Sequence, residues 1–216
     1  MVRLDIFADP ICPWCYLGKT LLDRALAARP DHPFVIEWHP FLLNPEMPPE
    51  GMDHMVYLTQ HFGSAEAAGK ADAQVVAAAR AAGVDLDLSR VSRTPSTIDA
   101  QRLIYWAGVE DRQDAVVDAL FAAHFEDGRD ISDPETLADL ADSAGLDAAV
   151  MTKLLRSDVD KDEIRSRDAT AREMGLTGAP TFIVNRVHAV PGVQPTELWL
   201  KVIDEIAGPG PAAARH

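Results

Sequence analysis

The chain has 216 residues, of which 47% are apolar and 25% charged, so it can fill one large domain with a real core and differs clearly from a disordered protein. Its 20 Lys and Arg residues against 34 Asp and Glu residues give a formal charge of −14. This charge argues against nucleic acids and anionic membranes as partners, since both attract basic surfaces.

The first predicted strand and helix meet at a pair of cysteines. Residues 3–9 alternate apolar and polar side chains, which predicts a short strand. Leucines at helical spacing follow in residues 14–29, and Pro13 suits the first helical turn because that position needs no backbone N–H. Cys12 and Cys15 therefore lie where a strand passes into a helix.

The middle of the chain is predicted to be mostly helical. Residues 34–43 have the pattern of a second strand, and the proline-rich residues 44–53 that of a loop. Helical patterns, some of them with a capping residue at the start, follow at 64–83, 98–107, 111–125, 133–145, 147–156 and 159–174.

Two strands and a helix complete the predicted fold. Residues 181–185 and 187–192 suggest a hairpin, and Pro195 opens a last helix that runs to Ile206. The resulting order, β-α-β, a helical block, then β-β-α, predicts an α/β protein with a thioredoxin fold that carries a large all-helical insertion.

This order also predicts the domain boundaries. We assign residues 1–48 and 175–208 to the thioredoxin-fold domain and residues 49–174 to the helical insertion. Residues 209–216, rich in Gly, Pro and Ala, are expected to form a disordered tail.

The two cysteines of the chain are separated only by Pro13 and Trp14. Two cysteines cannot form a disulfide scaffold for a chain of this size, and a structural zinc site needs four ligands at spacings that the histidines do not offer, so we expect no metal. No signal sequence is visible, which predicts the cytoplasm, where structural disulfides rarely persist. A redox-active dithiol is favoured over two structural cysteines or a Cys2His2 site assembled across the fold.

The position of the pair suggests a different role for each sulfur. At a helix N-terminus the unpaired backbone N–H groups and the helix dipole favour a thiolate. The first sulfur of a C-x-x-C motif lies outside the first turn, and the second lies within bonding reach of it. Cys12 is therefore the predicted nucleophile, and Cys15 the buried thiol that resolves the mixed disulfide.

A known family shows the same combination of motifs. With CPWC after the first strand and GAPTFIV before the third, the chain resembles the DsbA-like branch of the thioredoxin superfamily, and within it the cytoplasmic FrnE-type dithiol–disulfide oxidoreductases. The stretches DPICPWCYLGK, FLLNPEMPPEG, STIDAQRLIYWA, GLTGAPTFIVN and HAVPGVQP extend this resemblance over nearly the whole chain. Kappa-class glutathione transferases and 2-hydroxychromene-2-carboxylate isomerases are similar, but typically have serine at the position of Cys12.

The resemblance implies roles for residues around the cysteines. Pro180, at the start of the third strand, would form a cis peptide bond opposite the pair, and Ala179 would offer backbone groups to an extended substrate segment. Pro13 and Trp14 would set the surroundings of the thiolate and form an apolar docking rim. The implied partners are protein or small-molecule thiols and disulfides; no cofactor is expected to be bound, and glutathione stays open as a redox partner.

Two positions depart from the patterns of these proteins. Several thioredoxin-like proteins have a buried carboxylate six residues before the first cysteine, where this chain has Ile6; its neighbour Asp5 should face the other side of the strand. FrnE-type chains often have N-T-x-x-A-H-x-L where residues 96–103 are STIDAQRL, so the roles of that Asn and His do not transfer. The proton acceptor for Cys15 is therefore not identified.

Three functions remain open from the sequence. A thiol–disulfide oxidoreductase, with isomerase activity included, is favoured. The second is a glutathione-dependent isomerase or transferase that acts on a small aromatic or electrophilic compound, and the third is a chaperone that uses an apolar cleft under the helical block. Tyr16 and His39, near the motif, are interpreted as a packing residue and a structural histidine, and both a monomer and a homodimer are compatible with the sequence.

Overall fold

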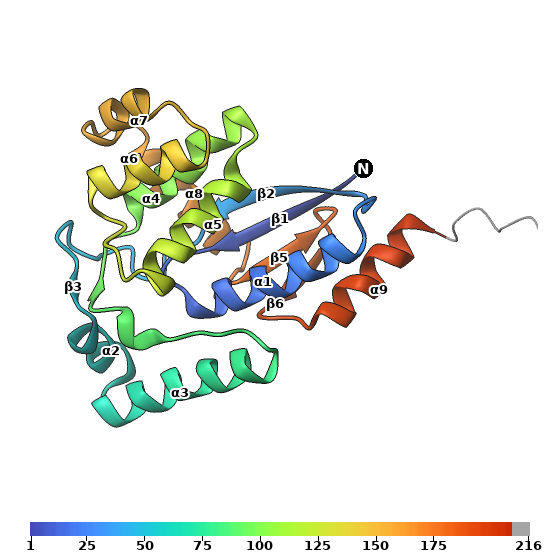
Figure 1. Cartoon of the computed structure of the whole chain (residues 1–216), viewed down its shortest axis with the longest axis horizontal. Coiled ribbons are helices and arrows are strands. Elements are labelled where there is room, and N and C mark those ends of the chain that lie inside the picture. The colour runs from blue at the N-terminus through green and yellow to red at the C-terminus, as the bar shows by residue number, and fades with distance from the viewer. Residues whose placement is uncertain (209–216) are drawn as a thin grey trace, which may run out of the picture.

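The structure is a computed structural model and describes residues 1–208. The predicted disordered tail, residues 209–216, lies outside the described residues. The chain forms a mixed four-stranded sheet with helices on both faces and a helical block beside it (Figure 1). None of the helices described is long and apolar enough to cross a membrane.

The central sheet has the strand order β2-β1-β5-β6. Its strands are β1 (Val2–Ala8), β2 (Phe34–Pro40), β5 (Thr181–Val184) and β6 (His188–Pro191). β1 and β2 are parallel because the helix α1 (Pro13–Ala28) carries the chain back between them, whereas β5 and β6 run antiparallel to their neighbours. This arrangement confirms the predicted thioredoxin fold.

The other helices fall into two groups. The last helix, α9 (Thr196–Ala207), packs beside α1 on one face of the sheet. The predicted insertion between β2 and β5 contains α2 (His54–Phe62), α3 (Ala65–Ala81), α4 (Ile98–Ala107), α5 (Gln113–Phe121), α6 (Pro134–Ser143), α7 (Ala148–Leu155) and α8 (Lys161–Glu173). It also holds the short helices η1 (Leu88–Arg90), η2 (Gly108–Glu110) and the π-helical η3 (Ala122–Glu126), and a small antiparallel sheet of β3 (Met52–Asp53) and β4 (Arg93–Thr94).

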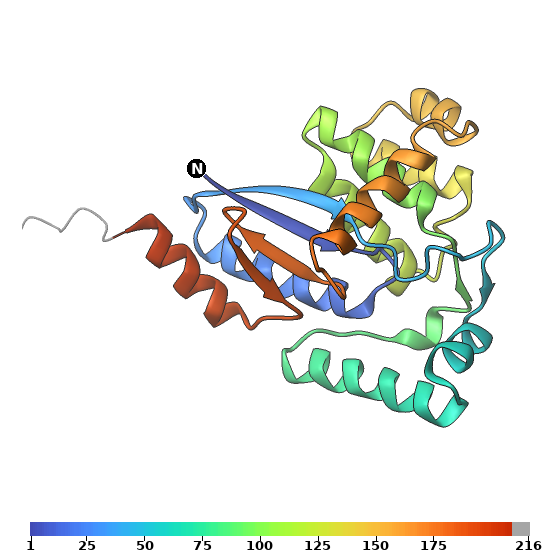
Figure 2. The same ribbon diagram turned by 180° about the vertical axis from the view of Figure 1, so that it is seen from behind.

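Alternation along β1 sends its side chains into two cores. Leu4 and Ile6 are buried in the main core together with Phe182 of β5 and Trp199 of α9. The rings of Phe182 and Trp199 pack edge-on, with their centroids 4.9 Å apart. Phe7 points to the opposite face and joins a smaller cluster that includes an alanine of α8. Figure 2 shows α8 lying near the ends of β1 and β2 on this side. The strand before the cysteines is therefore held on both faces.

The second strand is shorter than predicted and ends at Pro40. The next apolar residues leave the ladder because their backbone N–H groups have other partners. Leu42 donates to the Asp168 carboxylate at 2.8 Å, and Leu43 donates to the Asp9 carboxylate at 2.8 Å. This turn brings the end of the second strand over the junction that carries the cysteines.

The helical block differs from the prediction in two places. The predicted loop at 44–53 ends in β3, and α2 follows as a separate helix that the sequence pattern did not resolve. The predicted helix at 111–125 divides into α5 and the π-helical η3. The predicted helices at 64–83 and 133–145 begin with a capping residue as expected: Ser64 and Asp133 each accept a backbone N–H of the first turn.

A buried lysine joins α1 to the insertion. The Lys19 side chain is 3% exposed, and its Nζ lies 2.7 Å from Asp23, 3.3 Å from Asp114 and 2.7 Å from Asp118. Burial opposes the charged form, but the three carboxylates outweigh it and raise the pKa of Lys19 above its ordinary value. The last two acids belong to α5, so this cluster links the two parts of the fold.

Candidate active site

The cysteine pair lies at the junction between β1 and α1. Cys12 is the N-cap of α1 with an extended backbone, Pro13 follows in the first turn, and the Cys12 Sγ accepts the backbone N–H of Cys15 at 3.4 Å. An N-terminal proline fits here because the first helical turn leaves its N–H groups unpaired. The Cys15 N–H and the positive end of the helix dipole thus lie at the sulfur of Cys12, where they favour negative charge.

Both thiols are free and almost fully buried. Cys12 is 3% exposed and Cys15 is 1% exposed. Burial raises the pKa of Cys15 well above its ordinary value, and a hydrogen bond to Cys12 and the charge of Cys12 add to this rise. The two sulfurs therefore differ. The Cys12 sulfur lies at the N-terminus of α1, whereas Cys15 is a buried thiol that stays protonated.

The segment before β5 closes over the pair. The Ala179–Pro180 peptide bond is cis, and the Cys12 thiol donates to the Ala179 carbonyl oxygen across 3.6 Å. Pro180 reaches α1 at Gly18, where an added Cβ would lie 3.2 Å from the Pro180 Cγ. The structure thus brings the cysteine pair, Cys12 and Cys15, together with Ala179 and Pro180, which lie far away in the sequence.

A buried carboxylate that the sequence did not identify lies at the same junction. Asp9 is 0% exposed, and its oxygens accept the N–H of Ile11 at 3.2 Å, the N–H of Leu43 at 2.8 Å and the hydroxyl of Thr97 at 3.2 Å. Burial raises the pKa of Asp9 to about 6 although these hydrogen bonds oppose the rise.

Asp9 is also a neighbour of the second cysteine. Its charge contributes to the raised pKa of Cys15, while a hydrogen bond with its backbone lowers it. The position expected to hold a carboxylate, six residues before Cys12, is occupied by Ile6, which is 1% exposed in the core. An acidic residue directly after an apolar strand and three residues before Cys12 was the available signal for this group.

Asp5 and His39 lie in a separate polar cluster on the other face of the sheet. The Asp5 carboxylate is 2.6 Å from the Arg3 guanidinium and 2.7 Å from the His39 ring, and Arg3 also pairs with Glu37 at 2.7 Å. Asp5, Glu37 and His39 are spaced closely enough to hold a metal ion, but both carboxylates already form ion pairs with Arg3. We interpret this cluster as structural, as the sequence indicated for His39.

The insertion reaches the cysteine junction through two polar side chains. Thr97 donates to Asp9, and the Gln101 amide donates to the Ala8 carbonyl oxygen at 2.8 Å; both residues are buried. They lie within the segment where FrnE-type chains have the Asn and His motif. Here the segment supports the end of β1 with hydrogen bonds from uncharged side chains.

A small pocket opens beside Cys12. It has a volume of about 210 Å³ and is lined by Pro13, Trp14 and Ala179 together with residues of α2, α3, η1 and η3. Trp14 is 37% exposed, so its ring reaches solvent at this pocket. The wall from the insertion, which includes Tyr57 and His124, was not predicted, because no local pattern shows which helices pack over the cysteines. A larger groove of about 680 Å³ follows the outer edge of β2 and contains neither cysteine.

Tyr16 follows the cysteines on α1 and serves packing. Its ring lies 5.7 Å from Phe121 and 5.5 Å from Phe125 between centroids, and its hydroxyl donates to Glu126 at 2.9 Å. Burial raises the pKa of Tyr16 to about 12, which keeps the phenol protonated at neutral pH.

Comparison with known proteins agrees with this geometry. The family model described as DSBA-like thioredoxin domain matches residues 3–204. The crystal structure of a probable DsbA oxidoreductase from Streptomyces coelicolor is 31% identical in sequence, with a TM-score of 0.83 over 100% of this chain and 94% of that chain.

Two more distant structures share the fold. The cytosolic disulfide reductase DsbM from Pseudomonas aeruginosa, solved with GSH, is 18% identical with a TM-score of 0.69 over 95% of this chain and 98% of that chain. A 2-hydroxychromene-2-carboxylate isomerase is 15% identical with a TM-score of 0.68 over 95% of this chain and 93% of that chain.

Proposed function

Because the chain belongs to the DSBA-like thioredoxin domain family, we propose that it is a dithiol–disulfide oxidoreductase that exchanges disulfides with protein or small-molecule partners. Cys12 acts as the nucleophile and Cys15 as the resolving thiol. One observation carries this proposal: two free thiols share a helix N-terminus, with the Cys15 N–H 3.4 Å from the Cys12 Sγ.

The first step forms a mixed disulfide. The Cys12 thiolate attacks one sulfur of a partner disulfide, the partner's S–S bond breaks, and the released thiolate takes a proton from water. The Ala179 carbonyl, now a neighbour of the Cys12 sulfur at 3.6 Å, marks where the backbone of a bound partner would lie. Pro180 and Gly18, in contact, hold that segment against α1.

The second step uses Cys15. Formation of the mixed disulfide removes the negative charge of Cys12, and with it two of the causes that keep the pKa of Cys15 high. Asp9, whose pKa of about 6 leaves it mainly ionised at neutral pH, is the buried group that we propose to accept the Cys15 proton. Cys15 then attacks the Cys12 sulfur, an internal disulfide forms, and the second partner thiol leaves.

Reduction of a protein disulfide and of a small disulfide tests the proposal. Insulin and bis(hydroxyethyl) disulfide are offered to the reduced protein, to Cys12→Ser and to Cys15→Ser. We expect turnover only with both cysteines present. Activity of the Cys12→Ser variant at the wild-type rate would exclude the mechanism.

A second candidate is a glutathione-dependent isomerase or transferase that acts on a small aromatic or electrophilic compound. The small pocket beside Cys12 and the fold shared with the isomerase favour it. Such a reaction needs no thiol of the protein. Turnover of an aromatic substrate with glutathione by the variant that lacks both Cys12 and Cys15 would support it, and would count against disulfide exchange as the main activity.

We also propose that the protein acts in the cytoplasm, without a bound cofactor, and that glutathione is one candidate for its reductant. The fold that it shares with a reductase described as cytosolic, and solved with GSH, supports the location and the reductant. Detection of the protein in a membrane or extracellular fraction would contradict the location, and failure of glutathione to reduce the internal disulfide would contradict the reductant.

A further inference from the structure

We propose that the pocket beside Cys12 selects small, uncharged disulfides that carry an aromatic or apolar group over glutathione disulfide. This inference rests on the disulfide exchange proposed above and names the substrate class of that site. The size of the pocket, the chemistry of its wall and its charge each point to this class.

The pocket accepts little more than one ring beside the sulfur. Cys12 is 3% exposed, and the cavity in front of it measures about 210 Å³. This equals the liquid volume of roughly seven water molecules, and it is below the ~300 Å³ at which pockets for drug-sized ligands begin. A partner sulfur with one ring-sized substituent can be buried in this space, whereas the tripeptides of glutathione disulfide are too large for it.

The wall of the pocket is largely apolar and aromatic. Tyr57 and Leu58 of α2 and Val75 of α3 are buried side chains that line it. Trp14 and Phe62 also line it and are 37% and 42% exposed, so their rings lie where the pocket meets solvent. Such rings bind a flat, uncharged substituent by burial and offset stacking, which a hydrated, charged peptide does not gain.

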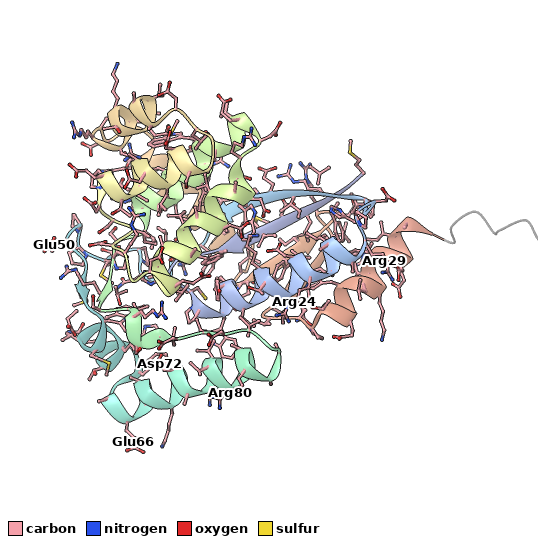
Figure 3. All side chains as sticks on the ribbon, in the orientation of Figure 1. Arg24, Arg29, Glu50, Glu66, Asp72 and Arg80 are labelled. Atoms are coloured by element: carbon pink, nitrogen blue, oxygen red, sulfur yellow. The ribbon has the colours of Figure 1, made fainter. Side chains whose placement is uncertain are left out.

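The charge of the pocket favours an uncharged disulfide over glutathione disulfide. Within the described part of the chain, no Lys or Arg lines it, and Asp72 contributes a carboxylate. Figure 3 shows Asp72 on the side of α3 that faces the body of the protein, whereas Glu66 points away from it. Burial lowers the pKa of His124 to about 4, so this imidazole is neutral, and burial also lowers the pKa of His54. Glutathione disulfide carries a net negative charge, which would meet the Asp72 carboxylate and no Lys or Arg side chain.

The reaction on this substrate is balanced by the dithiol alone. The Cys12 thiolate attacks one sulfur of R–S–S–R, which gives Cys12–S–S–R and one R–S⁻ that takes a proton. Cys15 loses its proton and attacks Cys12, and the second R–S⁻ leaves and is protonated. Two electrons pass from the cysteines to the small disulfide, and the protein ends with one internal disulfide.

Single-turnover rates of the reduced protein test the selectivity. Three probes are compared: dithiodipyridine, which is neutral and aromatic, bis(hydroxyethyl) disulfide, which is neutral without a ring, and glutathione disulfide. Each rate is divided by the rate of the same probe with free dithiothreitol, so that intrinsic reactivity cancels. We expect the normalised rate for dithiodipyridine to exceed that for glutathione disulfide by about tenfold or more, because only the ring gains from burial.

A matched pair of variants places the selectivity in the pocket. Ala71→Phe fills the pocket from α3, where Ala71 is half-buried, and Ala73→Phe adds the same ring to the exposed side of that helix. The first should remove the preference for dithiodipyridine over bis(hydroxyethyl) disulfide, and the second should leave it unchanged.

The outcomes separate this inference from the proposed function. Exchange with all three probes at similar normalised rates, or faster exchange with glutathione disulfide, overturns the selectivity and leaves the oxidoreductase in place. An unchanged preference in Ala71→Phe also overturns it. Exchange with none of the probes overturns both. If Ala71→Phe fails to fold, the normalised rates of the wild-type protein with the three probes decide whether the selectivity holds.

Discussion

Replacing Asp9 by Asn removes a buried acid while keeping its shape. Asp9 is 0% exposed and accepts hydrogen bonds from Ile11, Leu43 and Thr97. The new amide has one acceptor and one donor end, so it loses at least one of these bonds, which costs about 1–3 kcal/mol at every pH. The informative quantity is therefore the change of the free energy of unfolding with pH, because the cost of the lost hydrogen bond is the same at every pH and cancels.

The magnitude follows from the pKa of Asp9 in the folded protein. Burial raises it from an ordinary value of 3.8 to about 6, and a shift of roughly two pKa units corresponds to about 3 kcal/mol. The folded state binds the proton more tightly than the unfolded chain, so this contribution is fully present below 3.8 and is lost as the pH rises through about 6. Between about pH 4 and about pH 7 the wild type loses roughly 2 kcal/mol that Asp9→Asn does not lose.

Urea unfolding of both reduced proteins across this pH range measures the difference. Cys15, with its raised pKa, keeps its proton throughout and does not confuse the comparison. We expect the stability of Asp9→Asn to rise relative to that of the wild type by roughly 2 kcal/mol from the acidic to the neutral end. Curves that run parallel over the whole range would refute the raised pKa, and with it the role of Asp9 as proton acceptor.

Three further substitutions test the frame around the site. Lys19→Met leaves three half-exposed carboxylates without their cation and should lower the free energy of unfolding by about 2 kcal/mol; unchanged urea unfolding would contradict the joining role of this cluster. Gly18→Val pushes on Pro180, already 3.2 Å from the position of a Cβ, and should cost about 1–3 kcal/mol and slow disulfide exchange; an unaltered exchange rate would show that this contact is not needed. Tyr16→Phe loses one hydrogen bond to Glu126, so stability should fall by less than about 1 kcal/mol with the same exchange rate; a slower rate would reveal a chemical role for the phenol.

The parts of the fold that follow from local patterns were predictable. Alternation in residues 3–9 and the leucine spacing after Pro13 place Cys12 at a strand–helix junction, and the structure has this junction. The second strand ended early because donors in the next residues bond to carboxylates far away in the sequence, such as Asp168. Local periodicity carries no information on such distant partners.

The site was only partly predictable for the same reason. The C-x-x-C spacing pointed to Cys12 and Cys15, and the resemblance pointed to Ala179 and Pro180. The structure brings these two segments together. Asp9 was missed because its burial depends on the turn after β2 and on Thr97 of the insertion. The pocket depends on the packing of α2, α3 and η3, which no single segment encodes.

The most direct test of the account is to trap the mixed disulfide at Cys12. The reduced Cys15→Ser variant is mixed with a small disulfide, and the products are mapped by mass spectrometry. The account predicts one stable adduct on Cys12, and in the protein with both cysteines an internal disulfide without an adduct. No adduct on Cys12 of the variant, together with unchanged release of the partner thiol, would contradict the central role of this cysteine.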